Sequence, residues 1–326
     1  MTRNNYIEKV AIVGAGGNLG KHLTASLLAT GKHSVTAITR HDSANVPIAG
    51  VAIAKVDYSK QETLIEALKG HDALIITMSV TAPPETQTQI IDAAAAAGIP
   101  WIMPNEWGSD NDQKEYQRDT YLGAGQEKVR NYIDAKGCFN RLVLTCNFWY
   151  EHSLCSSPVM FGFDAEKRQA TFYGDGTVKI NTSTWNQCGR AVSALFSLPI
   201  QPENENDKSL TLQQFKNKSA YISSFFVSQK DMFASLLRVT GTTEKDWTIS
   251  YEDPKQRYAE GQKEFASGNR AGFGKLLYAR MFYPEGCGDY EAKLNNDLLG
   301  LPKEDLDEAT KRAIELAQSG YMYTRP

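Results

Sequence analysis

The sequence predicts an α/β protein in which a doubly wound parallel sheet is joined to a smaller C-terminal lobe. In the first 150 residues, short apolar runs of strand length alternate with longer amphipathic runs, which is the pattern of βαβ units. After residue 150 the alternation becomes irregular and aromatic residues become frequent. We therefore expect residues 1–150 with 185–225 to form the sheet domain, and residues 151–184 with 226–326 to form the lobe.

The first strand and the glycine turn after it carry the strongest signal. Val10–Val13 is a short apolar run, and glycines follow it at three-residue spacing before an amphipathic helix. In such a context the first glycine allows a tight turn, the second lets a pyrophosphate approach the backbone, and the third lets the helix pack on the strand. The stretch predicts a dinucleotide site rather than a plain glycine turn. Its residues are Gly14, Gly16, Gly17, Asn18, Leu19 and Gly20.

The end of the second predicted strand, His33–Thr39, distinguishes two cofactors. An NAD site carries an acidic residue here that bonds the ribose hydroxyls, whereas this chain has Thr39 and Arg40. A guanidinium binds a 2′-phosphate through paired hydrogen bonds, so we expect NADP with Thr39 and Arg40 in its site. The alternative for Arg40 is a surface ion pair with Asp42, and His41 is expected to be a solvated loop residue.

The remaining strands of the sheet domain and the helices between them follow in regular order. They are predicted at Val51–Val56, Gln61–Leu68, Ala73–Met78, Glu85–Ala97, Ile99–Met103 and Arg141–Thr145. Ligands of open parallel sheets lie beyond the carboxyl ends of the strands. We therefore expect Thr77, Met78 and Ser79 to lie against the cofactor. Asp57 is expected either to contact the adenine or to cap the following helix.

The C-terminal half is predicted as a smaller and less regular set of elements. They are a strand and turn at Phe172–Gly176, a helix at Gln187–Leu198 that returns to the sheet, a strand at Tyr221–Phe226, a helix at Gln229–Val239, and a helical tail at Tyr251–Pro326. The tail is rich in aromatic residues. We expect it to cover the open side of the cofactor cleft, where aromatic side chains can line a pocket for a planar substrate.

Composition limits the partners and the compartment. The net charge of −3 favours neither nucleic acid nor an anionic membrane as a partner. The start of the chain has no signal-peptide pattern, and no run reaches the ~18 apolar residues of a membrane span. The five cysteines are far apart and form no CxxC, which favours free thiols in a reducing cytoplasm, and the five histidines form no ligand-spaced pair. We expect a cytoplasmic protein without a metal site, whose partner is a small molecule.

The run PNEWGSD at Pro104–Asp110, together with the glycine turn and Arg40, resembles a known family. The chain is similar to NmrA-like proteins of the isoflavone and phenylcoumaran benzylic ether reductase group, which are atypical short-chain dehydrogenases. Asn105, Glu106, Trp107 and Gly108 fall on the loop that this family carries after its fifth strand. Further stretches that resemble it are Lys128–Gly137, Asn147–Leu154, Tyr173–Lys179, Trp185–Arg190 and Leu299–Pro302.

This resemblance implies a Rossmann fold, NADP as cofactor, and reduction of an aromatic or conjugated metabolite, as in secondary metabolism. It implies that Asn105, Gln126 and Asn147 contact the cofactor. It also implies that the substrate lies against Trp107, Trp149 and Tyr150.

One departure from the family affects the chemistry. The reductases carry a catalytic lysine two residues before the position of Lys128, and this chain has Gln126 there. Glutamine forms hydrogen bonds but carries no titratable proton. We exclude the YxxxK pair Tyr132 and Lys136 because they lie toward the far end of their helix, more than two helical turns from its start.

Three other residues remain candidates for proton transfer, and each also has a structural interpretation. They are Tyr121, Lys128 and His152. Core packing is the alternative for Tyr121, and a solvated helix face is the alternative for Lys128.

Three functions are therefore considered for a monomer or homodimer. The first is an NADPH-dependent reductase. The second is a non-catalytic, redox-sensing regulator that binds NADP, which the glutamine at position 126 favours. The third is a non-redox cyclase or dehydratase on the same fold. An open pocket at Trp149, Tyr150 and His152 favours an enzyme, and a blocked pocket favours the regulator.

Overall fold

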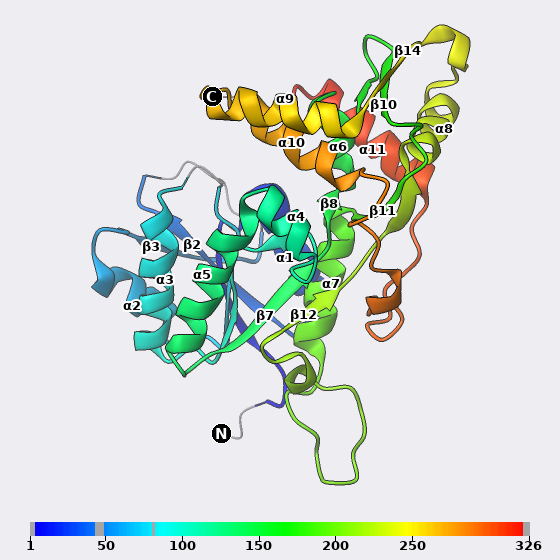
Figure 1. The fold of residues 1–326 in the computed structure, drawn as a ribbon. Helices are drawn as coiled ribbons and strands as arrows, with labels where there is room; N and C mark the ends of the chain where they lie inside the picture. Colours follow the sequence, from blue (N-terminus) through cyan, green and yellow to red (C-terminus); the bar gives the residue numbers. More distant parts are fainter. Residues whose placement is uncertain (1–3, 43–48, 80–81, 322–326) are drawn as a thin grey trace.

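A parallel sheet forms the larger part of the fold (Figure 1). The computed structural model describes residues 4–42, 49–79 and 82–321. The sheet has the strand order β12-β7-β5-β4-β1-β2-β3, and the short strand β6 also pairs with β7. Its strands are β1 Lys9–Val13, β2 Ser34–Arg40, β3 Ala52–Val56, β4 Ala73–Ile76, β5 Trp101–Met103, β6 Trp107–Gly108, β7 Asn140–Thr145 and β12 Lys218–Tyr221. All neighbouring pairs are parallel, so the carboxyl ends of the strands share one edge.

Helices cover both faces of this sheet. They are α1 Asn18–Ala29 and α7 Trp185–Ser197 on one face, and α2 Gln61–Leu68, α3 Pro84–Ala97 and α5 Leu122–Ala135 on the other. Successive residues of β1 point to opposite faces: Val10 and Ile12 join one core, and Ala11 and Val13 join the other. After the exposed Lys9 the strand is therefore apolar, as expected where both faces are buried. The predicted doubly wound parallel sheet is confirmed.

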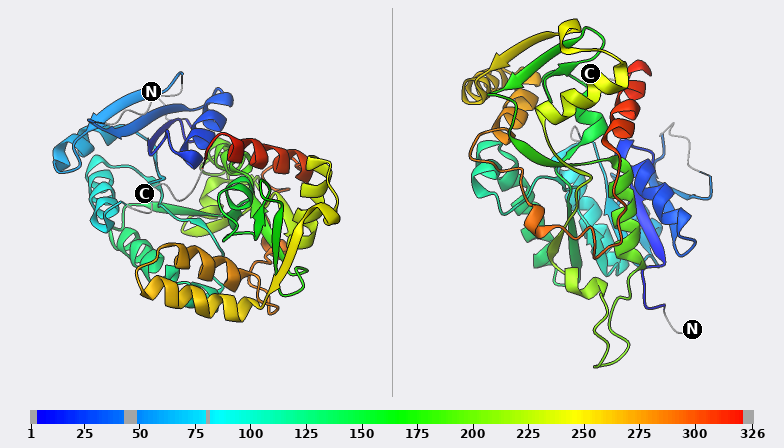
Figure 2. Two further views of the ribbon diagram at one scale, coloured as in Figure 1. Left: turned by 90° about the horizontal axis from the view of Figure 1, so that it is seen from above. Right: turned by 90° about the vertical axis from the view of Figure 1, so that its right-hand side faces the viewer.

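The second lobe lies beyond one end of the sheet domain (Figure 2). It contains two three-stranded sheets, β14-β10-β9 and β13-β11-β8. Their strands are β8 Phe148–Trp149, β9 Phe163–Asp164, β10 Gln169–Tyr173, β11 Lys179–Ser183, β13 Phe225–Ser228 and β14 Thr248–Glu252. The helices are α6 Tyr150–Cys155, α8 Gln229–Thr240, α9 Pro254–Ala266, α10 Ala271–Met281 and α11 Leu306–Gln318, while α4 Lys114–Asp119 belongs to the segment before α5. An aromatic-rich core, including Phe161, Phe172 and Phe282, holds the lobe together.

Most predicted elements differ from the observed ones by one to three residues at their ends, but one prediction is wrong in kind. Tyr221–Phe226 was predicted as one strand, whereas β12 ends at Tyr221 and β13 begins at Phe225 in a different sheet. The backbone N–H of Ser223 donates to the Asn296 side chain, and that of Ser224 donates to the Thr182 carbonyl. These contacts from distant segments turn the chain from the large sheet into the lobe.

The predicted helical tail is also interrupted. Between α10 and α11, residues 282–305 contain only the short 3₁₀ helix Glu291–Lys293. This strap is tied to the sheet domain through Lys293, whose ammonium group lies 2.7 Å from Asp110 and 2.9 Å from Asp112. Asp110 belongs to the loop after β6, so the strap fixes a loop that reaches the site described below.

Cys138, Cys146, Cys188 and Cys287 are free thiols, and the side chain of Cys155 lies outside the described set. Every helix within the described ranges is too short or too polar to cross a membrane.

Candidate active site

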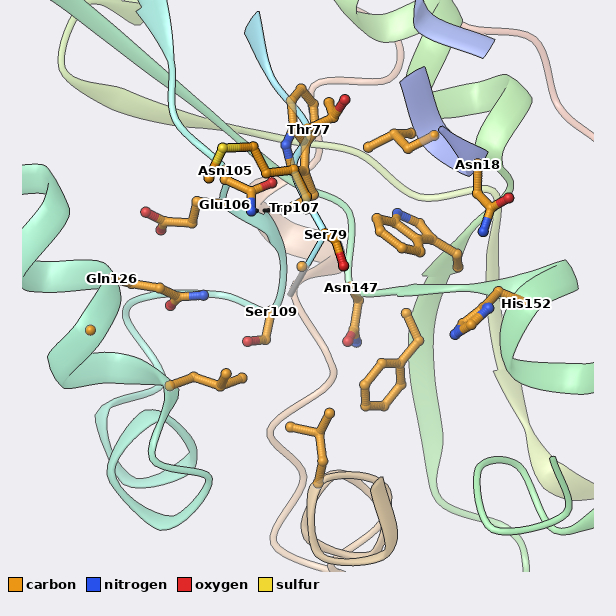
Figure 3. A pocket seen from close by; sticks show the side chains of 18 of the residues that line it. Asn18, Thr77, Ser79, Asn105, Glu106, Trp107, Ser109, Gln126, Asn147 and His152 are labelled. Atoms are coloured by element: carbon orange, nitrogen blue, oxygen red, sulfur yellow. Dashed lines mark hydrogen bonds between the residues drawn. The ribbon is translucent and has the colours of Figure 1, made fainter. Parts of the chain in front are cut away.

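A cavity of about 760 Å³ lies between the carboxyl edge of the large sheet and the lobe (Figure 3). Its lining begins at the glycine turn and extends to the helices of the lobe. Fourteen of the predicted site residues line it: Gly17, Asn18, Leu19, Gly20, Thr77, Met78, Ser79, Asn105, Trp107, Tyr121, Gln126, Asn147, Trp149 and His152. The structure therefore brings together predicted residues that are up to 135 positions apart in the sequence (17 to 152).

The three spaced glycines have different geometric roles. Gly14 has φ +85°, and a Cβ there would lie 2.2 Å from the Thr77 carbonyl oxygen. A Cβ on Gly20 would lie 2.0 Å from the Gly14 carbonyl oxygen. At Gly17, apart from its chain neighbours and its own helix backbone, the only heavy atom of the described residues within 4 Å of such a Cβ is the Gly14 carbonyl oxygen, at 3.1 Å. Gly14 and Gly20 are thus required for packing, whereas Gly17 borders open space.

Helix α1 presents its N-terminus to this open space. Its N-cap is Gly17, which offers no side-chain capping hydrogen bond. The first N–H groups of a helix have no partner within the helix, and the helix dipole adds partial positive charge there. A helix start without a side-chain cap, next to the open space at Gly17, fits an anionic phosphate.

Three side chains hold the strand ends around the cavity in fixed positions. The Thr77 hydroxyl is hydrogen-bonded to the carbonyls of Val13 (3.0 Å) and Gly14 (3.1 Å). The Asn105 amide donates to the Met78 carbonyl (3.1 Å), and the Trp107 indole N–H donates to the Ile76 carbonyl (2.9 Å). The loop after β5 is thereby attached to the end of β4.

Two predicted cofactor residues carry buried polar atoms without a partner in the described part of the chain. They are Oδ1 of Asn147 and Oε1 of Gln126, and both residues line the cavity. Asn147 is 3% exposed and adopts a left-handed backbone with φ +51°. A buried polar atom left unpaired costs about 1–3 kcal/mol. Together with the glycine turn, these atoms fit a polar ligand of dinucleotide type.

Glu106 is the one carboxylate among the lining residues of the described ranges. Its side chain pairs with the Arg130 guanidinium at 2.6 Å and with the Asn111 amide. Burial raises the pKa of Glu106, although Arg130 acts in the opposite direction. The pair is enclosed, since the side chains of Arg130 and Glu106 are 16% and 5% exposed.

The three candidates for proton transfer differ in position. Tyr121 lines the cavity but is 55% exposed; its ring stacks on Phe265. His152 lines it as well, and burial lowers the pKa of His152 to about 4, so its ring is neutral near pH 7. Lys128 is exposed and does not line the cavity. Residues two apart on a helix point in nearly opposite directions, so Gln126 faces the cavity while Lys128 faces away.

Several predicted residues lie outside the cavity. Tyr150 is fully buried in the lobe core, where its hydroxyl is 2.7 Å from that of Thr310, so its position does not support contact with a substrate. Arg40 and Asp57 lie at the ends of β2 and β3, and so does Thr39. Arg40 forms the alternative ion pair with Asp42 at 3.6 Å. The Asp57 carboxylate accepts from the N–H (3.0 Å) and hydroxyl (2.6 Å) of Ser59. Gly14 and Gly16 belong to the turn but are not among the residues that line the cavity.

The excluded pair Tyr132 and Lys136 also lies away from the cavity. The Tyr132 hydroxyl donates to Asp92 at 2.7 Å, and the Lys136 ammonium pairs with the same carboxylate at 2.6 Å. Neither lines the cavity. The geometric argument for excluding them agrees with this position.

Sequence reasoning missed much of the lobe side of the cavity. The missed residues include Ser109, Tyr116, Phe148, Met160, Phe273, Leu277, Tyr278 and Tyr321. Ser109 lies inside the motif Pro104–Asp110 and could have been included on that ground. Phe148 lies in the stretch Asn147–Leu154, and three of the others (Phe273, Tyr278 and Tyr321) lie in the aromatic-rich tail that was expected to line a pocket. No local signal marks Tyr116, Met160 or Leu277, because they come from separate elements that meet only in the folded chain.

Comparisons with known proteins agree with this geometry. Residues 7–161 match the NmrA-like family. Oxidoreductase aprR from Aspergillus flavus is 26% identical over 306 residues, covering 92% of this chain and 96% of that protein. Isoflavone reductase homolog P3 from Arabidopsis thaliana is 28% identical over 193 residues, covering 53% of this chain and 59% of the plant protein.

Solved structures show the same fold. AtPrR2 with NADP+ and (+)pinoresinol superposes with a TM-score of 0.72 at 19% identity, covering 95% of this chain and 99% of that one. The resemblance predicted from Pro104–Asp110 is confirmed.

Proposed function

We propose that this chain, an NmrA-like protein over residues 7–161, is an NADPH-dependent reductase of aromatic or conjugated small molecules. The observation that carries the proposal is one open cavity that runs from the uncapped helix start of α1 to an aromatic and aliphatic lining in the lobe. Relatives named as an oxidoreductase and an isoflavone reductase homolog support it. So does a structural neighbour described with NADP+ and pinoresinol.

In this proposal one part of the chain binds the cofactor and the other binds the substrate. Residues 1–150 with 185–225 bind the cofactor, and residues 151–184 with 226–326 form the substrate lobe. Gly17 and the N–H groups of α1 face the pyrophosphate of the cofactor. The nicotinamide end is held by Asn105, Gln126 and Asn147. NADPH, when bound, supplies a hydride to an electrophilic carbon. The side chains of Trp107 and Trp149 exclude water from the place where the substrate lies.

Three side chains were candidates for proton transfer, and they differ in chemistry and in position. Gln126 occupies the position of the family's lysine and can only orient a polar group by hydrogen bonds. His152 is neutral near pH 7, so it can accept a proton but cannot act as an imidazolium acid. Tyr121 is the candidate that combines a hydroxyl proton with a place on the cavity wall. Lys128 retains a role only if its helix face is turned toward a ligand.

The proposal is tested by titrating NADPH and then following its absorbance with a panel of neutral phenolic and conjugated carbonyl compounds. We expect binding of NADPH, and oxidation of NADPH with at least one compound, with mass-spectrometric detection of a product heavier by two hydrogens. Binding of NADPH without oxidation by any of the panel would instead favour the NADP-binding regulator, the function that Gln126 supports. Failure to bind NADPH would contradict both.

The choice of NADP over NAD gives a separate prediction. Arg40→Ala is expected to weaken NADPH binding by about 1.5–3 kcal/mol, because a charge-assisted pair to the 2′-phosphate is lost. NADH binding is the internal control and should not change, since NADH lacks that phosphate. Fluorescence titrations of both cofactors against both proteins measure this. Equal affinities of the parent for NADPH and NADH would contradict the assignment.

A further inference from the structure

Ser109 lines the cavity together with Gln126 and Asn147, whose amide oxygens have no partner in the described part of the chain. It belongs to the loop after β6, is half-buried, and lines the cavity. In Figure 3 the amide of Gln126 and the hydroxyl of Ser109 point toward one another on one side of the cavity, with Asn147 on the other side of Ser109. The three side chains form a neutral polar group in the middle of the site.

The hydrogen-bond direction of the Ser109 hydroxyl follows from its contact with the buried side chain of Gln117. Gln117 in α4 is 4% exposed, and its Nε2 donates both to the Asp110 carbonyl (3.1 Å) and to Ser109 Oγ (3.0 Å). A carbonyl only accepts hydrogen bonds, so Asp110 fixes which end of the Gln117 amide faces this loop. Ser109 therefore acts as the acceptor toward Gln117, and its own hydroxyl proton remains available to a ligand.

The charges of the cavity indicate what kind of ligand fits. None of its lining residues in the described ranges is lysine or arginine. The carboxylate of Glu106 is already paired with Arg130, and His152 is neutral near pH 7. The wall nearest the lobe is apolar, with Phe148, Met160 and Leu277 among its members. An anionic substrate would lie there without a counter-charge, whereas a neutral ring compound would bury apolar surface.

We propose that the Ser109 hydroxyl donates a hydrogen bond to the carbonyl oxygen of a neutral aromatic substrate. This inference rests on the proposed function and names the substrate class and a residue that contacts it. The hydrogen bond draws electron density toward the oxygen and makes the conjugated carbon more electrophilic. In this way Ser109 supplies an orienting and polarising contact, which the neighbouring amide of Gln126 supports.

The test compares two probes of nearly equal shape, one with a carbonyl oxygen and one without. 1-Tetralone and tetralin are titrated into the protein in the presence of NADP+, which cannot reduce the ketone, and tryptophan fluorescence is followed. Trp107 and Trp149 line the cavity and report binding directly. Ser109→Ala is expected to weaken 1-tetralone binding about two- to tenfold, the range of one neutral hydrogen bond, and to leave tetralin binding unchanged.

Ser109→Thr is the matched control, because it keeps the hydroxyl and should retain the preference for the ketone. An equal loss for both probes in Ser109→Ala would show a merely structural role and overturn the proposal. So would unchanged 1-tetralone affinity, or a parent protein that binds tetralin as well as 1-tetralone. NADP+ is titrated first and alone: if it fails to bind, the proposed function is contradicted, whereas normal NADP+ binding without a Ser109 effect contradicts only this inference.

Discussion

Gly17→Val is expected to abolish NADPH binding while the chain remains folded. A valine side chain at this position would project into the space where we place the pyrophosphate and would cover the first N–H groups of α1. We expect the affinity to fall about a hundredfold or more, equivalent to about 2.8 kcal/mol at 1.4 kcal/mol per tenfold change. The fold should tolerate the change, because a Cβ at Gly17 meets one atom, the Gly14 carbonyl oxygen, at 3.1 Å.

Gly20→Val provides the contrast within the same turn. Its Cβ would lie 2.0 Å from the Gly14 carbonyl oxygen and cannot be accommodated without moving the backbone. We therefore expect Gly20→Val to lower the thermal unfolding midpoint strongly, and Gly17→Val to change it little. Fluorescence titration with NADPH and thermal unfolding separate the two effects. Normal NADPH binding by Gly17→Val would show that the phosphates lie elsewhere.

Arg130→Met is expected to destabilise the fold by about 3–5 kcal/mol, the usual cost of removing one partner of a buried ion pair. The guanidinium lies 2.6 Å from the Glu106 carboxylate, and both side chains are largely enclosed. Without Arg130 the charge of Glu106 would be left in an apolar setting. Denaturant unfolding of the parent and the variant measures this difference.

The loss of unfolding free energy in Arg130→Met should depend on pH, with a definite sign. Burial raises the pKa of Glu106 in the folded chain, and Arg130 partly offsets that rise. Loss of Arg130 should raise the pKa of Glu106 further. The folded variant then binds more protons than its unfolded state over a wider pH range. Stability then falls as pH rises through that range. The deficit should be small where Glu106 is protonated in both states and should grow toward neutral pH.

Lys69→Met is the control for this comparison. Lys69 also lies 2.6 Å from a carboxylate, that of Glu66, but the two side chains are 58% and 75% exposed. Exposed pairs of this kind contribute about 0–1 kcal/mol. Equal destabilisation by Arg130→Met and Lys69→Met, or a deficit of Arg130→Met that is independent of pH, would contradict the role assigned to the buried pair.

Local patterns were sufficient for the sheet domain, and the reason is physical. A parallel strand buried on both faces must be apolar along its length, and Val10–Val13 and Ala73–Ile76 show this directly in the sequence. The glycine turn is also a local signal, because its glycine spacing and the close approach of Gly20 to Gly14 lie within one short stretch, although the close approach at Gly14 is to Thr77 after β4. The family motif at Pro104–Asp110 then placed the loop that enters the site.

The limits of prediction from sequence are clearest where one predicted strand corresponds to two strands, β12 and β13, in the structure. The run Tyr221–Phe226 has strand-forming residues on both sides of two serines, and partners more than 40 positions away, such as Thr182 and Asn296, hold the backbone of those serines between two sheets. The same applies to Tyr150, which follows the cavity residue Trp149 by one position but turns into the lobe core. Periodicity indicates which residues share a face of an element, but not what that face meets.

The sequence by itself was enough to predict the strands and helices up to β5 and the glycine turn after β1, because each depends on residues close together in the chain. Only the tertiary structure decided that Gln126 faces the cavity while Lys128 faces away, that Gln117 orients the Ser109 hydroxyl, and that Arg130 neutralises Glu106. These depend on how elements distant in sequence pack together, and packing is set by the summed burial of whole elements rather than by any short motif.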